Sequence, residues 1–289
     1  MDRDIIFGNP GIDWLFGNEG QDQINGGKGD DGVFGGKDND VLYGDEGNDL
    51  ISGDRGSDII FGGSSNPEVN DLGNDIIFGG DEDDEIYGNG GNDSLIGGTG
   101  DDTAFGGQGQ DVIWGESGED FLAGDRGNDT LCGGDGSDTI LGGAGNDTAC
   151  GGAGSDHLFG NEGNDTLHGG EGADILRGGM GDDSLVGGDG GDVLAGELGN
   201  DVLIGGRGSD QFVVGANGGF DIIRNFDSRS DVIVLDGSVA LSEVQLVPNA
   251  IGVEVRSGAQ ILATLEGVTP NSIIPISENG GAVVPLSAL

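Results

Sequence analysis

The chain lacks the features that stabilise or anchor several classes of protein. Its 289 residues include only two cysteines and six prolines, so a disulfide framework does not hold the fold together. No run of 18 apolar residues occurs, and none of the chain is predicted to span a membrane. Met1 is followed by Asp2, Arg3 and Asp4, so we expect no cleavable N-terminal signal peptide.

Positive charge is also scarce. The chain carries 10 basic and 54 acidic residues, which gives a formal net charge of −44. This excess argues against binding to nucleic acid or to anionic membrane surfaces. It favours a cationic partner, and metal ions are the simplest one. Glycine, with 67 residues, is far above the roughly 7% of ordinary chains. Its period of nine rather than three excludes collagen.

A nine-residue repeat organises most of the chain. Residues 79–213 divide into fifteen units without remainder, such as GGDGSDTIL (133–141) and GGAGNDTAC (142–150). Each unit begins with Gly and has Asp at its sixth place, and nearly all have an aliphatic residue at the eighth. The same register extends to the N-terminus, where residues 1–7 match the end of a unit. Such a period predicts a stack of equal structural units.

Residues 62–78 interrupt the period, because they number 17 rather than 18. One interpretation is a decayed unit in which Pro67 replaces Asp and Val69 keeps the apolar place, followed by a short unit that contains Asp75. The other is an eight-residue loop inside a single unit. We prefer the first because Val69 keeps the apolar place, and it predicts that Pro67 removes one or two metal sites.

The residue types at this spacing indicate calcium chemistry. The last three places alternate as a short strand whose middle side chain points inward. Glycine at the first, second and fourth places permits positive φ and close backbone approach in a turn. Asp supplies a hard anionic oxygen, the ligand type that Ca²⁺ prefers. The inward aliphatic residues are too few to order so glycine-rich a chain, so metal binding is expected to supply folding energy.

Two units form an 18-residue coil, so Asp residues 18 apart stack about 4.8 Å from one another. An ion between successive coils would convert their repulsion into bonding. About 20 gaps, and hence about 20 Ca²⁺ ions, nearly neutralise the chain. On the preferred interpretation of residues 62–78, one row of expected metal ligands contains Asp4, Asp22, Asp40, Asp58, Asp75, Asp93, Asp111, Asp129, Asp147, Asp165, Asp183 and Asp201. The other contains Asp13, Asp31, Asp49, Asp84, Asp102, Asp120, Asp138, Asp156, Asp174, Asp192 and Asp210, with Pro67 between Asp49 and Asp84.

The consensus GGxGxDxUx resembles the repeat of the RTX family, the haemolysin-type calcium-binding proteins, over residues 1–213. The resemblance implies an all-β fold, a parallel β-roll that winds as a right-handed solenoid. Each ion would lie between neighbouring turns, held by backbone carbonyls and sixth-place Asp residues. Residues 220–235 also resemble the segment that follows such arrays, with acidic places at Asp221, Asp227 and Asp231.

Residues 214–289 lack the nine-residue repeat and contain less glycine. Their pattern predicts a small β-rich cap on the solenoid. Aliphatic runs separated by Gly and Asn predict short strands. These runs are 220–226, 231–237, 244–247, 252–258 and 260–268. The resemblance further implies that this region carries an uncleaved signal for type I secretion machinery. The protein would then fold outside the cell and be extracellular or associated with the cell surface.

Motifs of catalysis are absent. The sequence has no HExxH, no P-loop and no GxSxG in a plausible setting, so we expect a calcium-binding protein and not an enzyme. Two alternatives stay open. The start in mid-repeat suits the non-catalytic carrier part of a larger toxin or hydrolase. Outward aromatic residues suit a surface-layer or adhesive protein that contacts copies of itself or a cell surface.

Three further signals concern the outward ninth place and the histidines. Cys132 and Cys150 both occupy that place, 18 residues apart, so a disulfide would have to join neighbouring coils in poor geometry, and we leave it open. His157 and His168 fall at different places, which argues against a shared metal site. Outward aromatic residues suit either cross-strand packing or a face for a partner, another copy or a carbohydrate. They are Phe7, Phe16, Phe34, Tyr43, Phe61, Phe78, Tyr87, Phe105 and Trp114.

Overall fold

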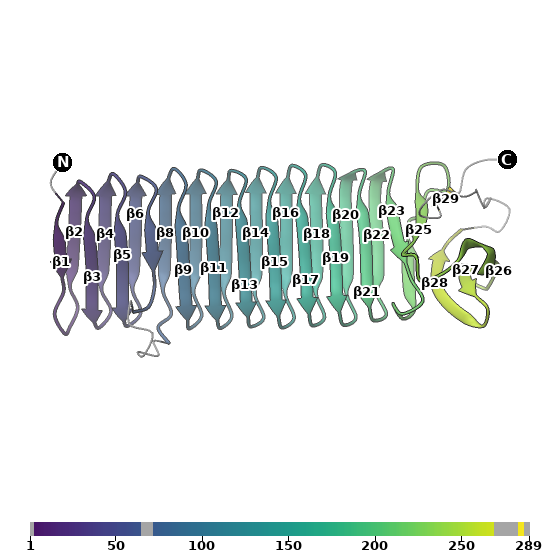
Figure 1. The fold of residues 1–289 in the computed structure, drawn as a ribbon, viewed down its shortest axis with the longest axis horizontal. Helices are drawn as coiled ribbons and strands as arrows, with labels where there is room; N and C mark the ends of the chain where they lie inside the picture. Colours follow the sequence, from purple (N-terminus) through teal and green to yellow (C-terminus); the bar gives the residue numbers. More distant parts are fainter. Residues whose placement is uncertain (1–2, 65–71, 269–282, 286–289) are drawn as a thin grey trace. The chain divides into compact units, whose positions relative to one another are not determined.

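The computed structural model describes residues 3–64, 72–268 and 283–285. Apart from one short 3₁₀ helix, every regular element in this part of the chain is a β-strand, and successive repeat strands fall alternately into two parallel sheets (Figure 1). The predicted all-β fold, a parallel β-roll, is therefore confirmed. By its internal contacts the chain divides into two compact units, Met1–Thr148 and Ala149–Leu289, which are described in turn.

In the first unit, odd-numbered strands form one sheet and even-numbered strands the other. The odd strands are β1 (Ile5–Phe7), β3 (Gln23–Lys28), β5 (Val41–Glu46), β7 (Ile59–Phe61), β9 (Glu85–Gly90), β11 (Thr103–Gln108), β13 (Phe121–Arg126) and β15 (Thr139–Ala144). The even strands are β2 (Trp14–Glu19), β4 (Gly32–Lys37), β6 (Leu50–Arg55), β8 (Ile76–Asp81), β10 (Ser94–Thr99), β12 (Val112–Ser117) and β14 (Thr130–Asp135).

The strands are longer than the sequence predicts. Most run from the seventh place of one unit through the first three places of the next, as in β12, so only places four to six remain as turn. The expectation of a three-residue strand and a six-residue turn was wrong. Pairing between strands nevertheless skips the first-place glycines: β10 and β12 pair on either side of Gly97 and Gly115 but not at them. This break leaves backbone groups of those glycines outside the regular ladder.

Inward eighth-place residues make the core between the two sheets. Ile24, Leu42, Ile113 and Leu131 all have 0% exposure, as the period predicts.

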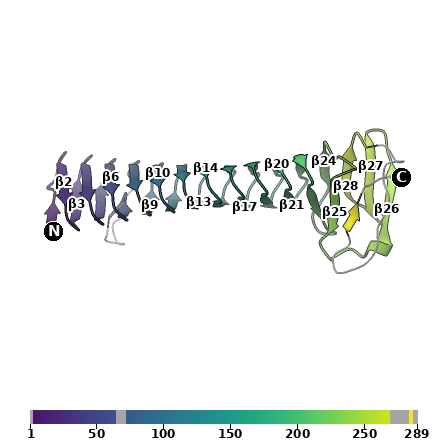
Figure 2. The ribbon, with the colours of Figure 1, turned by 90° about the horizontal axis from the view of Figure 1, so that it is seen from above.

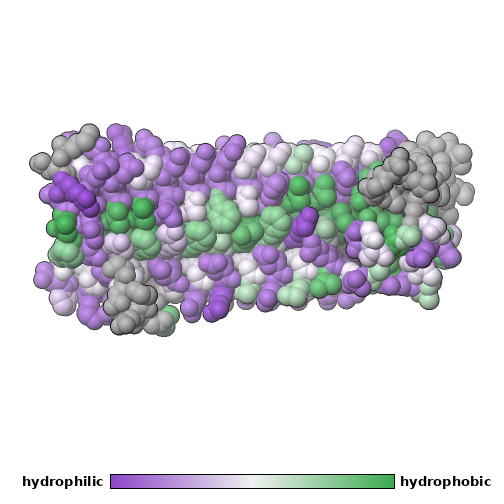
Figure 3. Space-filling view, in the orientation of Figure 1, coloured by the Kyte–Doolittle hydropathy of each residue, from purple (hydrophilic) through white to green (hydrophobic). Residues whose placement is uncertain are grey.

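Outward aromatic residues stack along the odd sheet, since the rings of Tyr43 and Phe61 lie 5.0 Å apart with an interplanar angle of 6°. Figure 3 shows hydrophobic residues along the middle of the face on view and hydrophilic residues toward its edges. Cross-strand ring packing is thus confirmed for Phe16 with Phe34 and for Tyr43, Phe61, Tyr87 and Phe105.

Backbone at the second and fourth places adopts positive φ, which explains the glycine content there. Where glycine is absent, Asn, Asp or Glu takes its place, as at Asn18 (φ 76°) and Asp38 (φ 71°). The fourth place is also crowded between coils. Gly127 has φ 149°, and a Cβ atom there would overlap the carbonyl oxygen of Gly109. Both conditions require glycine.

We therefore expect Gly127→Ala to destabilise the calcium-saturated protein by about 3 kcal/mol or more, because strain and overlap act together. Thermal unfolding in saturating calcium measures the loss. The control is Gly191→Ala at a fifth place, where the nearest atom to an added Cβ, the Ser209 carbonyl oxygen, lies 3.3 Å away. Equal losses in the two variants would contradict this account of the fourth place.

The interruption at residues 62–78 is an insertion inside one unit, and the decayed-unit interpretation was wrong. Leu50 pairs with Ile76, and Ile59 pairs with Glu85, so the spacing rises from 18 to 26 once and the register then resumes. Without residues 64–71 the unit would read GGLGNDIIF. Val69 was a misleading signal, because Leu50 pairs directly with Ile76. Pro67 and Val69 themselves lie outside the described residues.

Deletion of residues 64–71 is therefore expected to leave calcium stoichiometry unchanged, because the deletion restores an 18-residue coil. Stability should change little, since closing a short insertion has a small entropic cost. Bound calcium and calcium-dependent circular dichroism measure both. The control deletion removes residues 133–140, which shifts every later Asp out of register and should abolish the transition. Loss of two ions on deleting 64–71 would contradict the insertion.

In the second unit the same winding leads into a cap. The odd sheet contains β17 (His157–Glu162), β19 (Ile175–Met180), β21 (Val193–Leu198), β23 (Gln211–Val214), β25 (Val232–Leu235) and β29 (Val283–Pro285). The even sheet contains β16 (Thr148–Ala153), β18 (Thr166–Glu171), β20 (Ser184–Gly190), β22 (Val202–Gly208), β24 (Asp221–Arg224), β28 (Gln260–Glu266), β27 (Gly252–Ser257) and β26 (Val244–Pro248). A 3₁₀ helix, η1, spans Leu241–Glu243.

The cap extends the even sheet instead of merely covering it. β28 pairs in parallel with β24, and β27 and β26 follow as antiparallel neighbours that lie side by side (Figure 2). All five strands predicted after residue 214 are present. Phe212, fully buried at an eighth place, meets Phe226 with ring centroids 5.6 Å apart. The last repeats and the cap therefore share a hydrophobic core.

Candidate metal centre

Two rows of Asp residues follow the turns of the first unit. In each row the backbone N–H of one Asp donates to Oδ1 of the Asp on the next coil, as from Asp22 to Asp40 at 2.7 Å. The first row is Asp4, Asp22, Asp40, Asp58, Asp84, Asp102, Asp120 and Asp138. The second row is Asp13, Asp31, Asp49, Asp75, Asp93, Asp111, Asp129 and Asp147.

This order corrects the expected rows. Asp58 bonds to Asp84 at 2.8 Å and Asp49 bonds to Asp75 at 2.8 Å, whereas the sequence interpretation joined Asp58 to Asp75 and placed a gap before Asp84. Neither row is interrupted in this unit. The inserted residues therefore interrupt no Asp-to-Asp hydrogen bond, and the structure gives no reason to expect the loss of one or two metal sites at Pro67.

The second unit contains two rows of the same kind, and they run into the cap. One row is Asp156, Asp174, Asp192, Asp210 and Asp231. The other is Asp165, Asp183, Asp201 and Asp221. Asp221 and Asp231 thus continue the pattern, although 20 and 21 residues rather than 18 separate them from their predecessors. Asp227 does not join a row, because its N–H donates to Asp231 Oδ2 and its carboxylate accepts from the Arg229 N–H.

In most units the second carboxylate oxygen of the Asp lies close to the first glycine of its own unit. A Cβ atom added at Gly17 would lie 2.5 Å from Asp22 Oδ2 and 2.6 Å from the carbonyl oxygen of Gly35. In the other row, a Cβ atom at Gly88 would meet Asp93 Oδ2 and the Gly106 carbonyl oxygen at the same two distances. Carboxylate and carbonyl oxygens therefore converge where glycine leaves room.

Many of these second oxygens are buried and accept no hydrogen bond. They belong to Asp22, Asp31, Asp40, Asp58, Asp84, Asp102, Asp111, Asp120, Asp129, Asp174, Asp183, Asp192, Asp201 and Asp210. Buried polar atoms normally have a partner, and a buried ionised carboxylate without one costs several kcal/mol. A repeated defect of this kind indicates a bound cation.

Burial also shifts the acidity of these groups. It raises the pKa of Asp58 to about 7 and that of Asp84 to about 8, partly offset by the hydrogen bond from the preceding Asp backbone and reinforced by neighbouring acids. In the second unit, burial raises the pKa of Asp183 to about 7. Without a cation the rows therefore resist ionisation.

The donor set fits calcium. Every converging atom is an oxygen, from carboxylate or backbone carbonyl, and calcium takes several such ligands in flexible geometry. Within the described residues, no group of three or more His, Cys, Asp or Glu side chains could hold a metal by itself. The first-place glycine carbonyls would therefore have to complete each site. His157 and His168 are exposed and lie on different strands.

Fifth-place residues form a further ladder that the sequence interpretation missed. Asn48 Oδ1 accepts from the Asn74 N–H at 2.8 Å, and Asn74 Oδ1 accepts from the Asn92 N–H at 2.6 Å. Asp101 Oδ1 likewise accepts from the Glu119 N–H. The sequence signal for this ladder was the recurring Asn or Asp immediately before the sixth-place Asp. This ladder satisfies turn N–H groups and leaves the sixth-place carboxylates for the cation.

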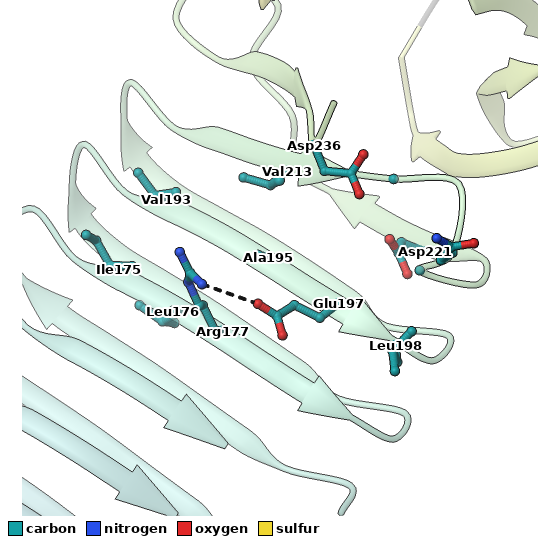
Figure 4. Close-up of a pocket in the computed structure, with 13 residues that line it drawn as sticks. Ile175, Leu176, Arg177, Val193, Ala195, Glu197, Leu198, Val213, Asp221 and Asp236 are labelled. Carbon is teal, nitrogen blue, oxygen red and sulfur yellow. Dashed lines mark ion pairs between the residues drawn. The ribbon is translucent and has the colours of Figure 1, made fainter. Parts of the chain in front are cut away.

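The second unit also contains a cleft of about 480 Å³ on the outer face of its odd sheet. Ile175, Val193 and Val213 line it, and Arg177 forms an ion pair with Glu197 at 3.6 Å (Figure 4). Asp236, at its rim, accepts from the Ser238 N–H at 2.7 Å. Its polar lining residues are Arg177, Glu197, Asn217, Asp221 and Asp236.

The stacked coils and their rows of carboxylate and carbonyl oxygens define a calcium-binding β-roll. The family described as RTX calcium-binding nonapeptide repeat matches residues 2–33, 34–67, 70–104, 96–131, 115–149, 133–158, 151–185, 177–212 and 186–223. The chain therefore belongs to this RTX family, and the resemblance inferred from the repeat is confirmed. No curated protein sequence matches the chain. The described residues form no helix long and apolar enough to cross a membrane.

Proposed function

We propose that this RTX repeat protein folds on binding about 20 Ca²⁺ ions between successive coils. The observation that carries the proposal is the row of buried Oδ2 atoms, most of which converge with a glycine carbonyl oxygen of the next coil on the same point. Bound calcium would supply the positive charge that these oxygens lack. The chain's own contribution is to hold the Asp oxygens in register, through Oδ1 and the preceding backbone N–H.

We further propose that the protein acts outside the cell, exported by type I secretion machinery, and that it is not an enzyme. Membership of the RTX family supports export by this route. A charge of −44 and raised carboxyl pKa values support a need for abundant calcium. An extracellular medium supplies millimolar calcium, so folding would follow export.

The number of ions tests this proposal directly. Fourteen Asp-to-Asp gaps in the first unit and seven in the second lead us to expect about 20 bound ions by elemental analysis of desalted protein. Asp120→Asn should bind one or two fewer, because its carboxylate bridges two coils. The matched control, Asp135→Asn at an exposed third place, removes the same charge and should retain all ions.

A second function, in surface attachment or adhesion, is supported by a different observation. Five large hydrophobic residues on the even sheet of the first unit remain 40–61% exposed. A secreted protein with such a face is suited to contact another surface.

A further inference from the structure

The outer face of the even sheet in the first unit has the composition of an interface. This face, called here the even face, consists of the seventh- and ninth-place side chains of β2, β4, β6, β8, β10 and β12. None of its twelve residues is charged, although the chain has 54 acids. Its exposed members are Trp14 (61%), Phe16 (53%), Ile76 (45%), Phe78 (40%) and Trp114 (40%). Depletion of charge and enrichment in aromatic residues are typical of interface centres.

We propose that the even face binds the even face of a second copy, in a face-to-face dimer with two-fold symmetry. Such an interface uses the same patch on both copies. Two flat sheets pack against each other at about 10 Å, and a partner with the same coil spacing matches the side-chain rows along several coils. A second copy of this chain has that spacing by construction.

Charge at the edge of the face supports a copy of the same chain as the partner. Third-place residues flank the face, and there Lys37 pairs with Glu19 at 2.5 Å and Arg55 with Asp81 at 3.5 Å. The remaining third-place residues on these six strands are Thr99 and Ser117, so the third-place row carries no net charge. The second-place row adds two exposed acids, Asp54 and Glu116, and Ser52 of the even face donates to the Asp54 carboxylate at 2.7 Å. The flank is therefore less acidic than the turns, which limits the repulsion between two copies of a polyanion.

The exposed area is close to what a dimer requires. An aromatic side chain offers about 150–250 Å², so the five exposed residues present roughly 500 Å² per copy. The half-buried Phe34, Leu50, Ile96 and Val112 add to this. A stable interface buries about 800 Å² per partner.

The ring geometry disfavours a carbohydrate as the occupant. Phe34 on β4 stacks with both Trp14 and Phe16 of β2, with ring centroids 5.8 and 5.0 Å away and interplanar angles of 9° and 12°. Ring faces that a sugar would stack on are thus turned toward neighbouring rings. In the second unit, none of the described seventh- or ninth-place repeat residues is an exposed large hydrophobic residue, so that unit offers matched control positions.

Sedimentation equilibrium in saturating calcium tests the proposal, and the expected result is a dimer. Ser94→Lys places a charge between Ile76 and Val112, its register partners on β8 and β12, without removing any apolar group. Ser184→Lys is the control at the same place on β20. We expect Ser94→Lys to weaken the dimer at least about a hundredfold and Ser184→Lys to leave it unchanged.

A second variant removes apolar area instead. The double variant Phe78→Ser with Trp114→Ser replaces two ninth-place aromatic residues by serine. Serine already occupies the ninth place on β6, as Ser52. This variant should also be a monomer. A monomeric wild-type protein, or equal dimers for Ser94→Lys and Ser184→Lys, would overturn the proposal. This proposal rests on the proposed function only because the even face exists in the folded protein and not in the unfolded chain. Circular dichroism on the same samples therefore separates failure to fold from failure to associate.

Discussion

Removal of calcium is expected to convert the protein from a β-roll to a coil. Titration with calcium should restore the β spectrum in a steep transition, because each ion joins two coils and prepares the next gap. The physical reason is the cost of the Asp rows. Each ionised, buried and uncompensated carboxylate costs several kcal/mol, and fourteen of those found here have an Oδ2 atom with no hydrogen-bond partner. A typical domain has only about 5–15 kcal/mol of stability.

Magnesium should not replace calcium in this experiment. It demands near-octahedral geometry and keeps several waters, whereas these sites are buried between backbone segments and filled by carbonyl and carboxylate oxygens. Far-UV circular dichroism in chelator, then with Ca²⁺ or Mg²⁺, is the measurement. A β spectrum already present in chelator would contradict the expectation, and it would mean that core residues such as Leu131 and the ladder hydrogen bonds are sufficient.

The sequence predicts the repeated part of this structure well because each residue type there has one physical task. Inward aliphatic residues such as Ile113 recur with the period and are buried as expected, and sixth-place acids such as Asp120 form the expected rows along the turns. The extent of the strands was not predicted, since glycine at the first and second places suggests turn chemistry. In the structure these glycines lie in strands, where their missing side chains leave room for Oδ2 atoms.

Features that occur only once in the chain, such as the insertion and the cap, were harder to predict. Either interpretation of residues 62–78 keeps an aliphatic residue in an apolar place, so periodicity alone could not decide between them. Only the pairing of Leu50 with Ile76 identifies an insertion. In the cap, five strands were predicted but not their order. β24 pairs with β28, and no local pattern records which distant strand a given strand will join.

Acidification should have the opposite effect to chelation. In calcium-free solution we expect β structure to appear as the pH falls from about 8 to about 4.5. The folded-state pKa values of Asp58, Asp84 and Asp183 are raised to about 7, 8 and 7, whereas an unfolded Asp titrates near 3.9. Between these values the folded chain binds protons that the unfolded chain does not. The free energy of unfolding of the metal-free fold therefore rises as the pH falls through 7.

Each such carboxyl contributes up to about 1.4 kcal/mol per unit of pKa difference, so several together give a large effect. Circular dichroism of calcium-depleted protein at stepped pH measures it, with sedimentation to exclude aggregation. The control is the calcium concentration at the midpoint of the folding transition. It should hardly change between pH 8 and pH 6, because the carboxyl groups of both the unfolded and the calcium-bound chain are ionised in this range. A chain that stays a coil down to pH 4.5 would show that neutralising the rows is not enough. Calcium would then stabilise the fold by joining coils, and not by removing buried charge alone.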